Sequence, residues 1–508
     1  MKRLAAALRL EARVQLRYGI VPAALALGAA WTLMLFVVPV EAAGTVAVYL
    51  LFIDAAAFGA LFVAALLLFE RTEATRQALT VTPLRSSESV AARLLALTLV
   101  SLIIALPMIV AGVRDRLEDL ARILPAALGG VALISLLLLT LCLAVGARSR
   151  DLSGFLLTAP PLVAPLIVLP LTHVSGILEH PLMYVVPTTV GADLIRLGTA
   201  PESLGASPTA VAVEVLHSSA CVALGVFLAH RAVKRGAVPP PHRNETGRDT
   251  TPSERPVTGR GRLPAIVRFV RIDLFGIGRD PLLLLMLCAP LLLALVIRLV
   301  FPPASEFLLV SHGFDLAPHT PVVLAVLVLL HVPMIFGVVG GLRATEDSDE
   351  NILLVLRASP VSMSAYLGYR LTLVTVLSLV GLAVALPLSG LMTSTWSPSV
   401  VVAVVLAALQ APLLTVVMTA VATNKVEALV VVKGVGAFLA LTPLAAWLLP
   451  SPWNLLLSPL PPSWPALALP GYDAGPLGAW ACLAGGLVVF ATASALLLRR
   501  TSYRFART

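Results

Sequence analysis

Ionisable side chains are rare inside the apolar runs of this 508-residue chain, and two of them occupy matching positions. Asp54 lies in "VYLLFIDAAAFGALF", and His331 lies 277 residues later in "LVLLHVPMIFGVVG". A charge within a membrane span costs about 2.5–3.5 kcal/mol on insertion scales, so such a residue usually faces a cavity or a partner. Asp54 and His331 are therefore candidates for a translocation pathway, where they would contact substrate or form a gate. The alternative is an interhelical hydrogen bond or ion pair that only packs the bundle.

Other polar residues in or near the apolar runs carry weaker signals. Further candidates of the same kind are Glu214, His217, Gln410 and Lys433. Lys433 is expected to extend toward the cytoplasmic headgroups, because a long lysine side chain near a span end can keep its ammonium in water. The histidines His173 and His180 have no third ligand nearby in sequence, and the four cysteines show no CxxC spacing. The sequence predicts no catalytic, cofactor or metal site in this chain.

A second repeated feature is a polar interruption between apolar runs. "ERTEATRQALTVTPLR" and "DSDENILLVLRASPVS" share a layout, with Glu73, Pro83 and Arg93 matching Glu350, Pro360 and Arg370 at the same offset of 277. Each reads as a short, partly exposed helix that meets a Thr-Pro or Ser-Pro step, where proline disfavours helix before it and suits the first turn after it. In the second copy, Asp347 with Glu350 resembles a capping box.

Such a helix, held between two spans, could receive a soluble partner, and its duplication favours that role over a plain linker. The candidate residues of the two segments are Glu70, Glu73, Arg76, Pro83, Asp347, Glu350 and Pro360.

Composition places these segments in a membrane protein. The chain is 58% hydrophobic and only 12% charged, whereas soluble proteins are about 25% charged. Its net charge of +9 fits the positive-inside bias of membrane proteins. Because no nucleic-acid-binding motif accompanies the charge, no nucleic-acid partner is predicted.

Apolar runs of about 20 residues predict an all-α polytopic membrane protein with about twelve transmembrane helices. The predicted spans are 20–40, 46–69, 90–112, 124–146, 155–173 and 207–232, followed by 281–301, 320–342, 367–392, 399–423, 429–450 and 477–498.

Arginine and lysine cluster before the first span, between spans two and three, in the central linker and after the last span. This pattern predicts cytoplasmic N and C termini. Residues 233–262 are rich in Pro, Gly, Thr and charge, which predicts a disordered cytoplasmic linker. We expect residues 1–232 and 263–508 to form two six-span halves with the same orientation, a parallel repeat.

The chain resembles the permease of a type-2 ABC exporter, in its fused twelve-span form similar to drug and antibiotic export permeases. The similar pieces are the interruptions above, the basic amphipathic segments "LRLEARVQLRYG" and "VRFVRIDLFGIGRDPLLLLMLCAP", and the loops "ARSRDLSGF" and "TNKVEALVV". "VVPTTVGADLIRLG" resembles the segment before the sixth span, whereas its counterpart near "PLPPSWPALALP" departs from it. In that family the interruptions are coupling helices seated on an ATP-binding subunit.

A partner ATPase is also indicated by what the chain lacks. A phosphate-binding P-loop needs Gly-Lys-Ser/Thr, and none of Lys2, Lys234, Lys425 and Lys433 follows a glycine. ATP and Mg²⁺ are therefore expected on a separate ATP-binding cassette subunit, present as two copies.

The predicted function is export of amphipathic or hydrophobic small molecules across the cell membrane by alternating access, energised by that partner. The chain itself is not expected to be an enzyme. The alternative is a proton-coupled twelve-span secondary efflux transporter, but neither interruption contains the Gly-x-x-x-Asp-Arg-x-Gly turn typical of the major facilitator class. A membrane-embedded enzyme would need a clustered catalytic constellation, which the scattered polar residues do not provide.

Overall fold

The computed structural model describes residues 2–72, 84–149, 152–178, 180–200, 208–235, 281–349, 363–392, 396–422, 425–473 and 478–505. Over these residues the chain forms helices joined by short turns and no strands. Eleven of the helical segments are long and apolar enough to cross a membrane, and they coincide with eleven of the twelve predicted spans. The remaining prediction, 46–69, lies inside the 33-residue helix α3. The all-α polytopic membrane fold is confirmed.

The first half of the structure comprises described residues 2–235. Its helices are α1 (Lys2–Arg17), α2 (Ile20–Val37), α3 (Val40–Thr72), α5 (Ser86–Gly112), α6 (Leu120–Arg148), α7 (Leu152–Val174), α8 (Pro187–Thr199) and α9 (Pro208–Arg235), with short 3₁₀ turns η1 (Leu117–Asp119) and η2 (Pro181–Val185).

The second half comprises described residues 281–505. Its helices are α11 (Pro281–His312), α12 (Thr320–Leu324), α13 (His331–Asp349), α15 (Met363–Ser389), α16 (Pro398–Ala408), α17 (Gln410–Val421), α18 (Lys425–Leu448), α19 (Ser463–Leu467) and α20 (Ala479–Phe505), with the short turns η4 (Ala317–His319), η5 (Ala325–Leu330) and η6 (Trp453–Leu457).

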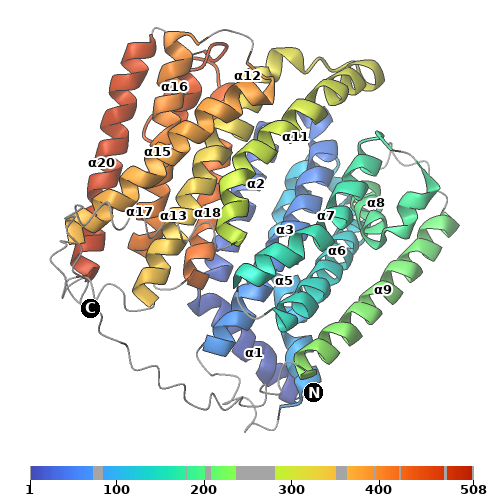
Figure 1. Ribbon diagram of the computed structural model, residues 1–508. Coiled ribbons are helices and arrows are strands. Elements are labelled where there is room, and N and C mark those ends of the chain that lie inside the picture. Colours follow the sequence, from blue (N-terminus) through green and yellow to red (C-terminus); the bar gives the residue numbers. More distant parts are fainter. Residues whose placement is uncertain are drawn as a thin grey trace, which may run out of the picture.

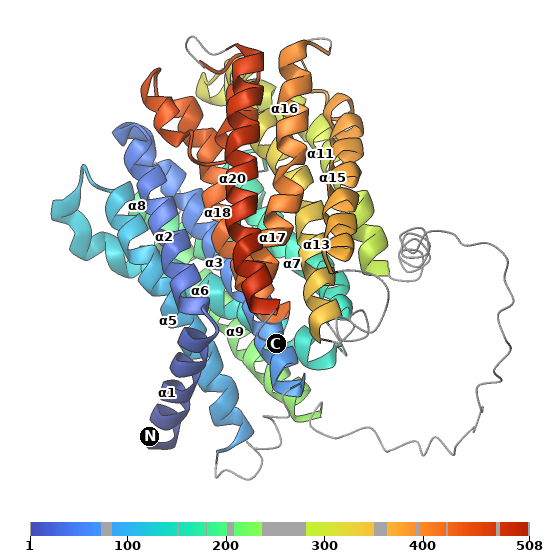
Figure 2. The same cartoon turned by 90° about the vertical axis from the view of Figure 1, so that its left-hand side faces the viewer.

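The helices of each half gather on their own side of the molecule, with α2, α3 and α18 at the boundary (Figures 1 and 2). Each half has its own large hydrophobic core. The start of α1 and the end of α20 lie toward the same end of the molecule in both views.

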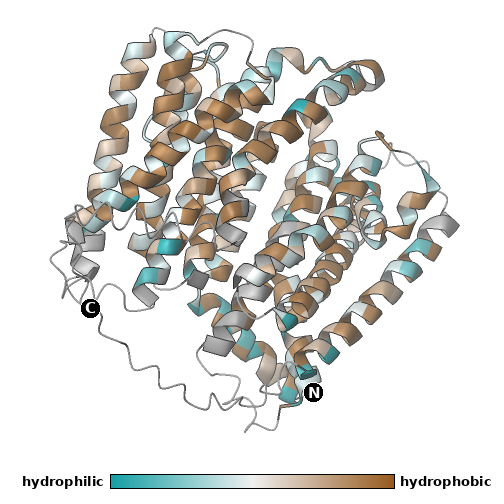
Figure 3. Ribbon diagram, viewed as in Figure 1, coloured by the Kyte–Doolittle hydropathy of each residue, from teal (hydrophilic) through white to brown (hydrophobic). Residues whose placement is uncertain are grey.

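The outer surface of the long helices is hydrophobic, as a lipid-facing surface must be. Leucine, valine and aromatic side chains are exposed on helices of both halves, for example Leu99, Leu216 and Val488. Figure 3 shows the same pattern, with hydrophobic residues along most of each long helix. The structure is that of a multi-pass membrane protein.

The amphipathic segment before the first span forms α1. Arg9, Arg13 and Arg17 are exposed along one face, and Glu11 and Gln15 are buried on the opposite face. The chain then turns at Gly19, whose φ of 72° is in the left-handed region that glycine adopts without strain. This turn changes the chain direction between the end of α1 and the start of α2.

Helix α8 packs on α6 through backbone contact at paired glycines. A Cβ added at Gly130 would lie 2.4 Å from the Gly191 carbonyl oxygen, and one added at Gly198 would lie 2.9 Å from the Ile123 oxygen. Small residues allow this approach, which is typical of membrane helix pairs. The corresponding segment of the second half forms only the five-residue α19, so the two halves differ here.

Substituting Gly130 with valine is therefore expected to separate α8 from α6, because the obstructing atom is backbone and cannot rotate away. We expect a loss of about 2–3 kcal/mol of unfolding free energy, seen as a lower thermal unfolding midpoint in detergent. Gly129→Val is the matched control, since a Cβ there meets nothing within 4 Å. Equal destabilisation by both variants would contradict the packing argument.

Candidate functional site

The two halves meet most closely along α2 of the first half and α18 of the second, and we call this contact the inter-half seam. Helix α18 also packs on α3, and Figures 1 and 2 both draw these three helices side by side. Val430 of α18 belongs to the hydrophobic core of the first half. Residues of both halves therefore line common spaces along this seam.

One such space, the amino-end pocket, lies where α2 and α18 begin and has a volume of about 520 Å³. Most of its wall is apolar, but Arg17 of the first half and Glu427 of the second also line it. The complete lining is Arg17, Tyr18, Gly19, Ala23, Ala26, Val417, Val421, Glu427, Val430, Val431, Gly434 and Val435.

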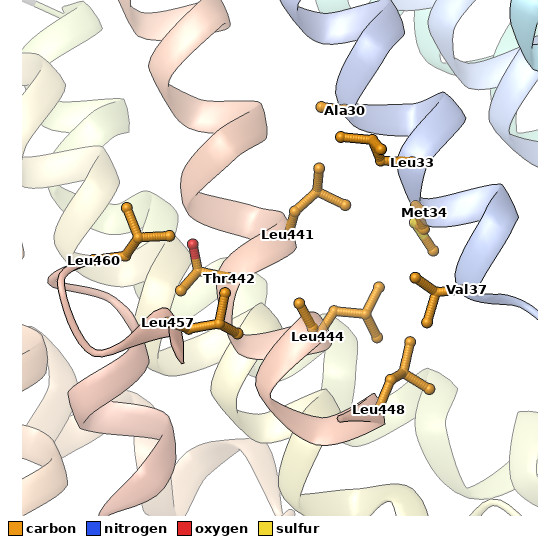
Figure 4. Close-up of a pocket in the computed structure, with 11 residues that line it drawn as sticks. Ala30, Leu33, Met34, Val37, Leu441, Thr442, Leu444, Leu448, Leu457 and Leu460 are labelled. Carbon is orange, nitrogen blue, oxygen red and sulfur yellow. The ribbon is translucent and has the colours of Figure 1, made fainter. Parts of the chain in front are cut away.

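The other space, the carboxyl-end pocket, lies where α2 and α18 end and has a volume of about 200 Å³. Its lining is apolar apart from the Thr442 hydroxyl, and Figure 4 shows it between the two helices. Because early residues of both helices line one pocket and late residues line the other, α2 and α18 run in the same direction. The lining residues are Ala30, Leu33, Met34, Val37, Leu441, Thr442, Leu444, Ala445, Leu448, Leu457 and Leu460.

Asp54 and Lys433 face one another across the same seam. Asp54 on α3 is only 6% exposed, and it interacts electrostatically with Lys433 of α18 and by a hydrogen bond with Trp31 of α2. Among the described side chains no direct salt bridge joins Asp54 to Lys433, and the Asp54 Oδ1 atom is buried without a hydrogen-bond partner. Asp54 and Lys433 thus interact across the boundary of the halves.

The predicted position of Lys433 is wrong. Its Nζ atom lies 5.0 Å from the centroid of the buried Phe62 ring on α3, rather than extending to headgroups. A cation over an aromatic face is attracted by the ring quadrupole. This contact and the Asp54 charge turn the side chain inward, toward the first half.

His331 is in a different setting from Asp54, although the two share the repeat offset. Its Nδ1 atom lies 2.6 Å from the Val326 carbonyl oxygen, so Nδ1 carries the proton and donates. Val326 belongs to η5, a six-residue π-helical turn. No hydrogen bond or ion pair joins His331 to Asp54 among the described residues, so these contacts do not unite them in one site.

Gln410 stabilises the same π-helical turn. A π turn shifts the backbone hydrogen-bond ladder and leaves carbonyl groups in need of donors. The Gln410 amide donates to the Leu329 carbonyl oxygen at 3.3 Å. Gln410 is the first residue of α17, and Leu409 separates α17 from α16 within the tenth predicted span. The polar contacts of Gln410 and His331 are those of residues that support the bundle.

Asp347 and Arg370 tie together the two helices that flank the second interruption. The Arg370 Nη2 atom lies 2.6 Å from the Asp347 carboxylate, with both side chains about nine-tenths buried. The Tyr366 hydroxyl also donates to that carboxylate. Asp347 lies within the last turn of α13, so its predicted place in a capping box is wrong: the helix continues through it instead of starting there.

Arg93, which matches Arg370 in the repeat, also makes a buried ion pair, but with a different partner. Its Nη2 atom lies 3.0 Å from Glu11 of α1. In both halves the arginine near the start of the third span thus anchors a neighbouring helix. Sequence reasoning missed Glu11, and the available signal was a single acid on the face of α1 opposite its arginines.

The remaining candidates of the two interruptions fall largely outside the described residues. Glu70 lies in the last turn of α3, and its side chain is not described. Glu73, Arg76, Pro83, Glu350 and Pro360 lie outside the described residues. Their role as coupling residues stays a prediction.

A polar cluster covers one end of the first half, where α7, η2, α8 and α9 meet. The His173 Nε2 atom lies 3.6 Å from the buried Asp193 carboxylate, and the His173 and Tyr184 rings pack edge to face. Burial, and then the charges of Asp193 and Glu214, raise the pKa of Tyr184 to about 12.

His217 lies 3.5 Å from the Val185 carbonyl oxygen, and the His180 side chain accepts from the Leu182 backbone N–H.

Comparison with known proteins accounts for nearly all of the chain. Residues 2–239 match the family model described as the fluoroquinolones export permease protein family, and residues 273–498 match one described as fluoroquinolones export permease protein Rv2686c-like. The fluoroquinolones export permease protein Rv2686c of Mycobacterium tuberculosis (strain ATCC 25618 / H37Rv) is 31% identical over 237 residues, which are 46% of this chain and 93% of the relative. The chain belongs to the fluoroquinolones export permease family.

A second relative in this family, the fluoroquinolones export permease protein Rv2687c of the same strain, is 31% identical over 223 residues, 44% of this chain and 91% of the relative. Each of these relatives therefore covers less than half of this family member. The predicted division at 232 and 263 stays a prediction, although one family model ends at 239 and the other begins at 273. No solved structure matches the chain.

Proposed function

We propose that this chain is the permease subunit of an ATP-driven ABC exporter that moves fluoroquinolone-like, amphipathic drugs out of the cell. The observation that carries the proposal is the family membership, because the relatives are named for fluoroquinolone export. The apolar pockets shared by α2 and α18 support it, since drug-sized ligands bind in largely apolar clefts that contain a few polar groups.

ATP and Mg²⁺ would be bound by a separate ATPase subunit, because the sequence has no Gly-Lys-Ser/Thr motif. We place one ATPase copy beneath each half, against residues 70–83 and 347–360, with both termini of the permease on the same cytoplasmic side. The ion pair between Asp347 and Arg370 supports the second docking place, since it would transmit movement of that segment to α13 and α15 together.

The mechanism would be alternating access between the two pockets. When the ATPase dimer closes on ATP, it would push the two interruptions toward one another and tilt the helices attached to them. Helix α18 would then shift against α2 and α3, changing the distance between the Asp54 and Lys433 charges. A drug would enter at the amino-end pocket and leave at the carboxyl-end pocket.

The test is reconstitution of the purified chain in liposomes, with and without an ABC ATPase subunit. We expect norfloxacin to accumulate on the far side only with ATPase, ATP and Mg²⁺ present. As a control, a Walker-lysine variant of the ATPase should give no accumulation. Movement of norfloxacin by the chain alone on a proton gradient would reject the proposal and favour the secondary-transporter alternative.

A further inference from the structure

The amino-end pocket carries one positive and one negative side chain on opposite sides of the seam. Arg17 comes from the last turn of α1 and Glu427 from the first turn of α18. A basic residue at a helix C-terminus and an acidic residue at a helix N-terminus are both favoured by the helix dipole. Arg17 and Glu427 therefore each lie at the helix end whose dipole suits the sign of their charge.

The space between these charges has the size and surface of a small-molecule site. Its volume of about 520 Å³ falls within the range of roughly 300–1,000 Å³ found for ligand pockets. Small residues form much of the wall near the helix contact, including Ala23, Ala26 and Gly434. A wall of short side chains leaves a smooth apolar surface that suits a flat, rigid molecule.

We propose that the amino-end pocket binds a flat, zwitterionic export substrate, with its carboxylate at Arg17 and its amine at Glu427. This inference rests on the proposed function, because fluoroquinolones with a basic ring substituent are flat aromatic molecules that carry one carboxylate and one amine. Guanidinium pairs well with carboxylate, and Glu427 supplies the opposite charge for an ammonium. The aromatic rings would lie between α2 and α18.

The pocket then selects by two opposite charges, and because these charges belong to different halves, one bound molecule would bridge the seam. A phospholipid headgroup such as phosphatidylethanolamine also carries an anion and an ammonium. A phospholipid, however, is neither flat nor rigid, and its two acyl chains belong in the bilayer rather than in a pocket of about 520 Å³. We therefore assign the pocket to the drug and treat lipid binding as an outcome of the test.

The experiment measures equilibrium binding of norfloxacin to the full-length chain in nanodiscs made only of phosphatidylglycerol, which carries no ammonium group. Arg17→Gln and Glu427→Gln should each weaken binding on the order of fivefold, as a partly exposed charge contact is worth up to about 1 kcal/mol. Norfloxacin methyl ester, which lacks the carboxylate, should bind wild type and Arg17→Gln equally. N-acetyl norfloxacin, which lacks the basic amine, should bind wild type and Glu427→Gln equally.

Two pairs of variants separate pocket binding from general effects on folding. Arg13 is exposed one turn before Arg17 and does not line the pocket, so Arg13→Gln should leave norfloxacin binding unchanged. Ala26→Phe should fill the pocket and weaken binding at least tenfold, whereas Ala29→Phe, at an exposed position of the same helix, should not.

If Arg17→Gln and Glu427→Gln weaken the binding of norfloxacin, its methyl ester and its N-acetyl derivative to the same extent, the pocket assignment is wrong. Equal effects of Ala26→Phe and Ala29→Phe would also overturn it, as would displacement of norfloxacin only by phosphatidylethanolamine with no effect of the charge variants. In each of these results wild-type binding persists, so the proposed function survives. If wild type neither binds nor exports any fluoroquinolone, the proposed function fails instead.

Discussion

Arg370→Ala is expected to lower the free energy of unfolding by about 3 kcal/mol, because removing one member of a buried ion pair leaves the other charge without compensation. Among the described residues, Asp347 would keep only the Tyr366 hydroxyl as a partner. The ends of α13 and α15 would no longer be tied at the base of the second interruption. We therefore also expect drug-stimulated ATP hydrolysis by the partner ATPase to fall about tenfold, through loss of transmitted movement.

Unfolding is measured by thermal denaturation in detergent, and coupling by ATPase rates with and without norfloxacin in liposomes. The exchange Asp347→Arg with Arg370→Asp restores the pair with reversed polarity and should recover much of both losses. Tyr366→Phe retains the ion pair and should have a smaller effect than Arg370→Ala. If the complex that contains Arg370→Ala shows wild-type ATP hydrolysis by its ATPase subunit and wild-type drug export, the helices are not coupled through this pair.

Lys433→Met is expected to reduce export by about tenfold and to lower the free energy of unfolding by about 2 kcal/mol, since Asp54 would lose the cation that faces it. The expected stability loss is smaller than for Arg370 because no direct salt bridge is broken. Methionine retains the apolar stem over Phe62, so the effect reports on charge rather than on lost packing.

The control for Lys433→Met is the double variant Asp54→Asn with Lys433→Met, which removes both charges. We expect the double variant to unfold near the wild-type temperature but to export poorly, if the charges act in transport. Full recovery of both stability and export would show that the two charges only compensate one another. The measurements are norfloxacin transport in the reconstituted complex and thermal unfolding of each variant.

The membrane spans could be predicted because a lipid environment permits very few backbone conformations. Every spanning backbone must satisfy its hydrogen bonds internally, so apolar runs of sufficient length predict helices directly. The run at 46–69 became part of the longer α3, which begins at Val40, because hydropathy marks where a helix is apolar and not where it starts. The offset of 277 also predicted correctly that Arg93 and Arg370 occupy comparable places.

Partners across the bundle could not be predicted in the same way. Lys433 was expected to reach the headgroups because sequence shows its position along a helix but not the direction of its side chain. Phe62 and Asp54, which decide that direction, lie more than 370 residues earlier in the chain. His331 shares an offset with Asp54, yet the π-helical turn beside it supplies a backbone acceptor that hydropathy does not show.

The parallel course of α2 and α18 has a mechanical consequence. The two pockets lie toward opposite ends of the same helix pair, and Ala23 and Met34, which line one pocket each, are about 16 Å apart along α2 at 1.5 Å per residue. A tilt of 10° about the midpoint of that distance moves each end by about 1.4 Å in opposite directions. Such a tilt would widen one pocket as it narrows the other, so one rigid rotation of the helix pair would change both pockets in opposite senses.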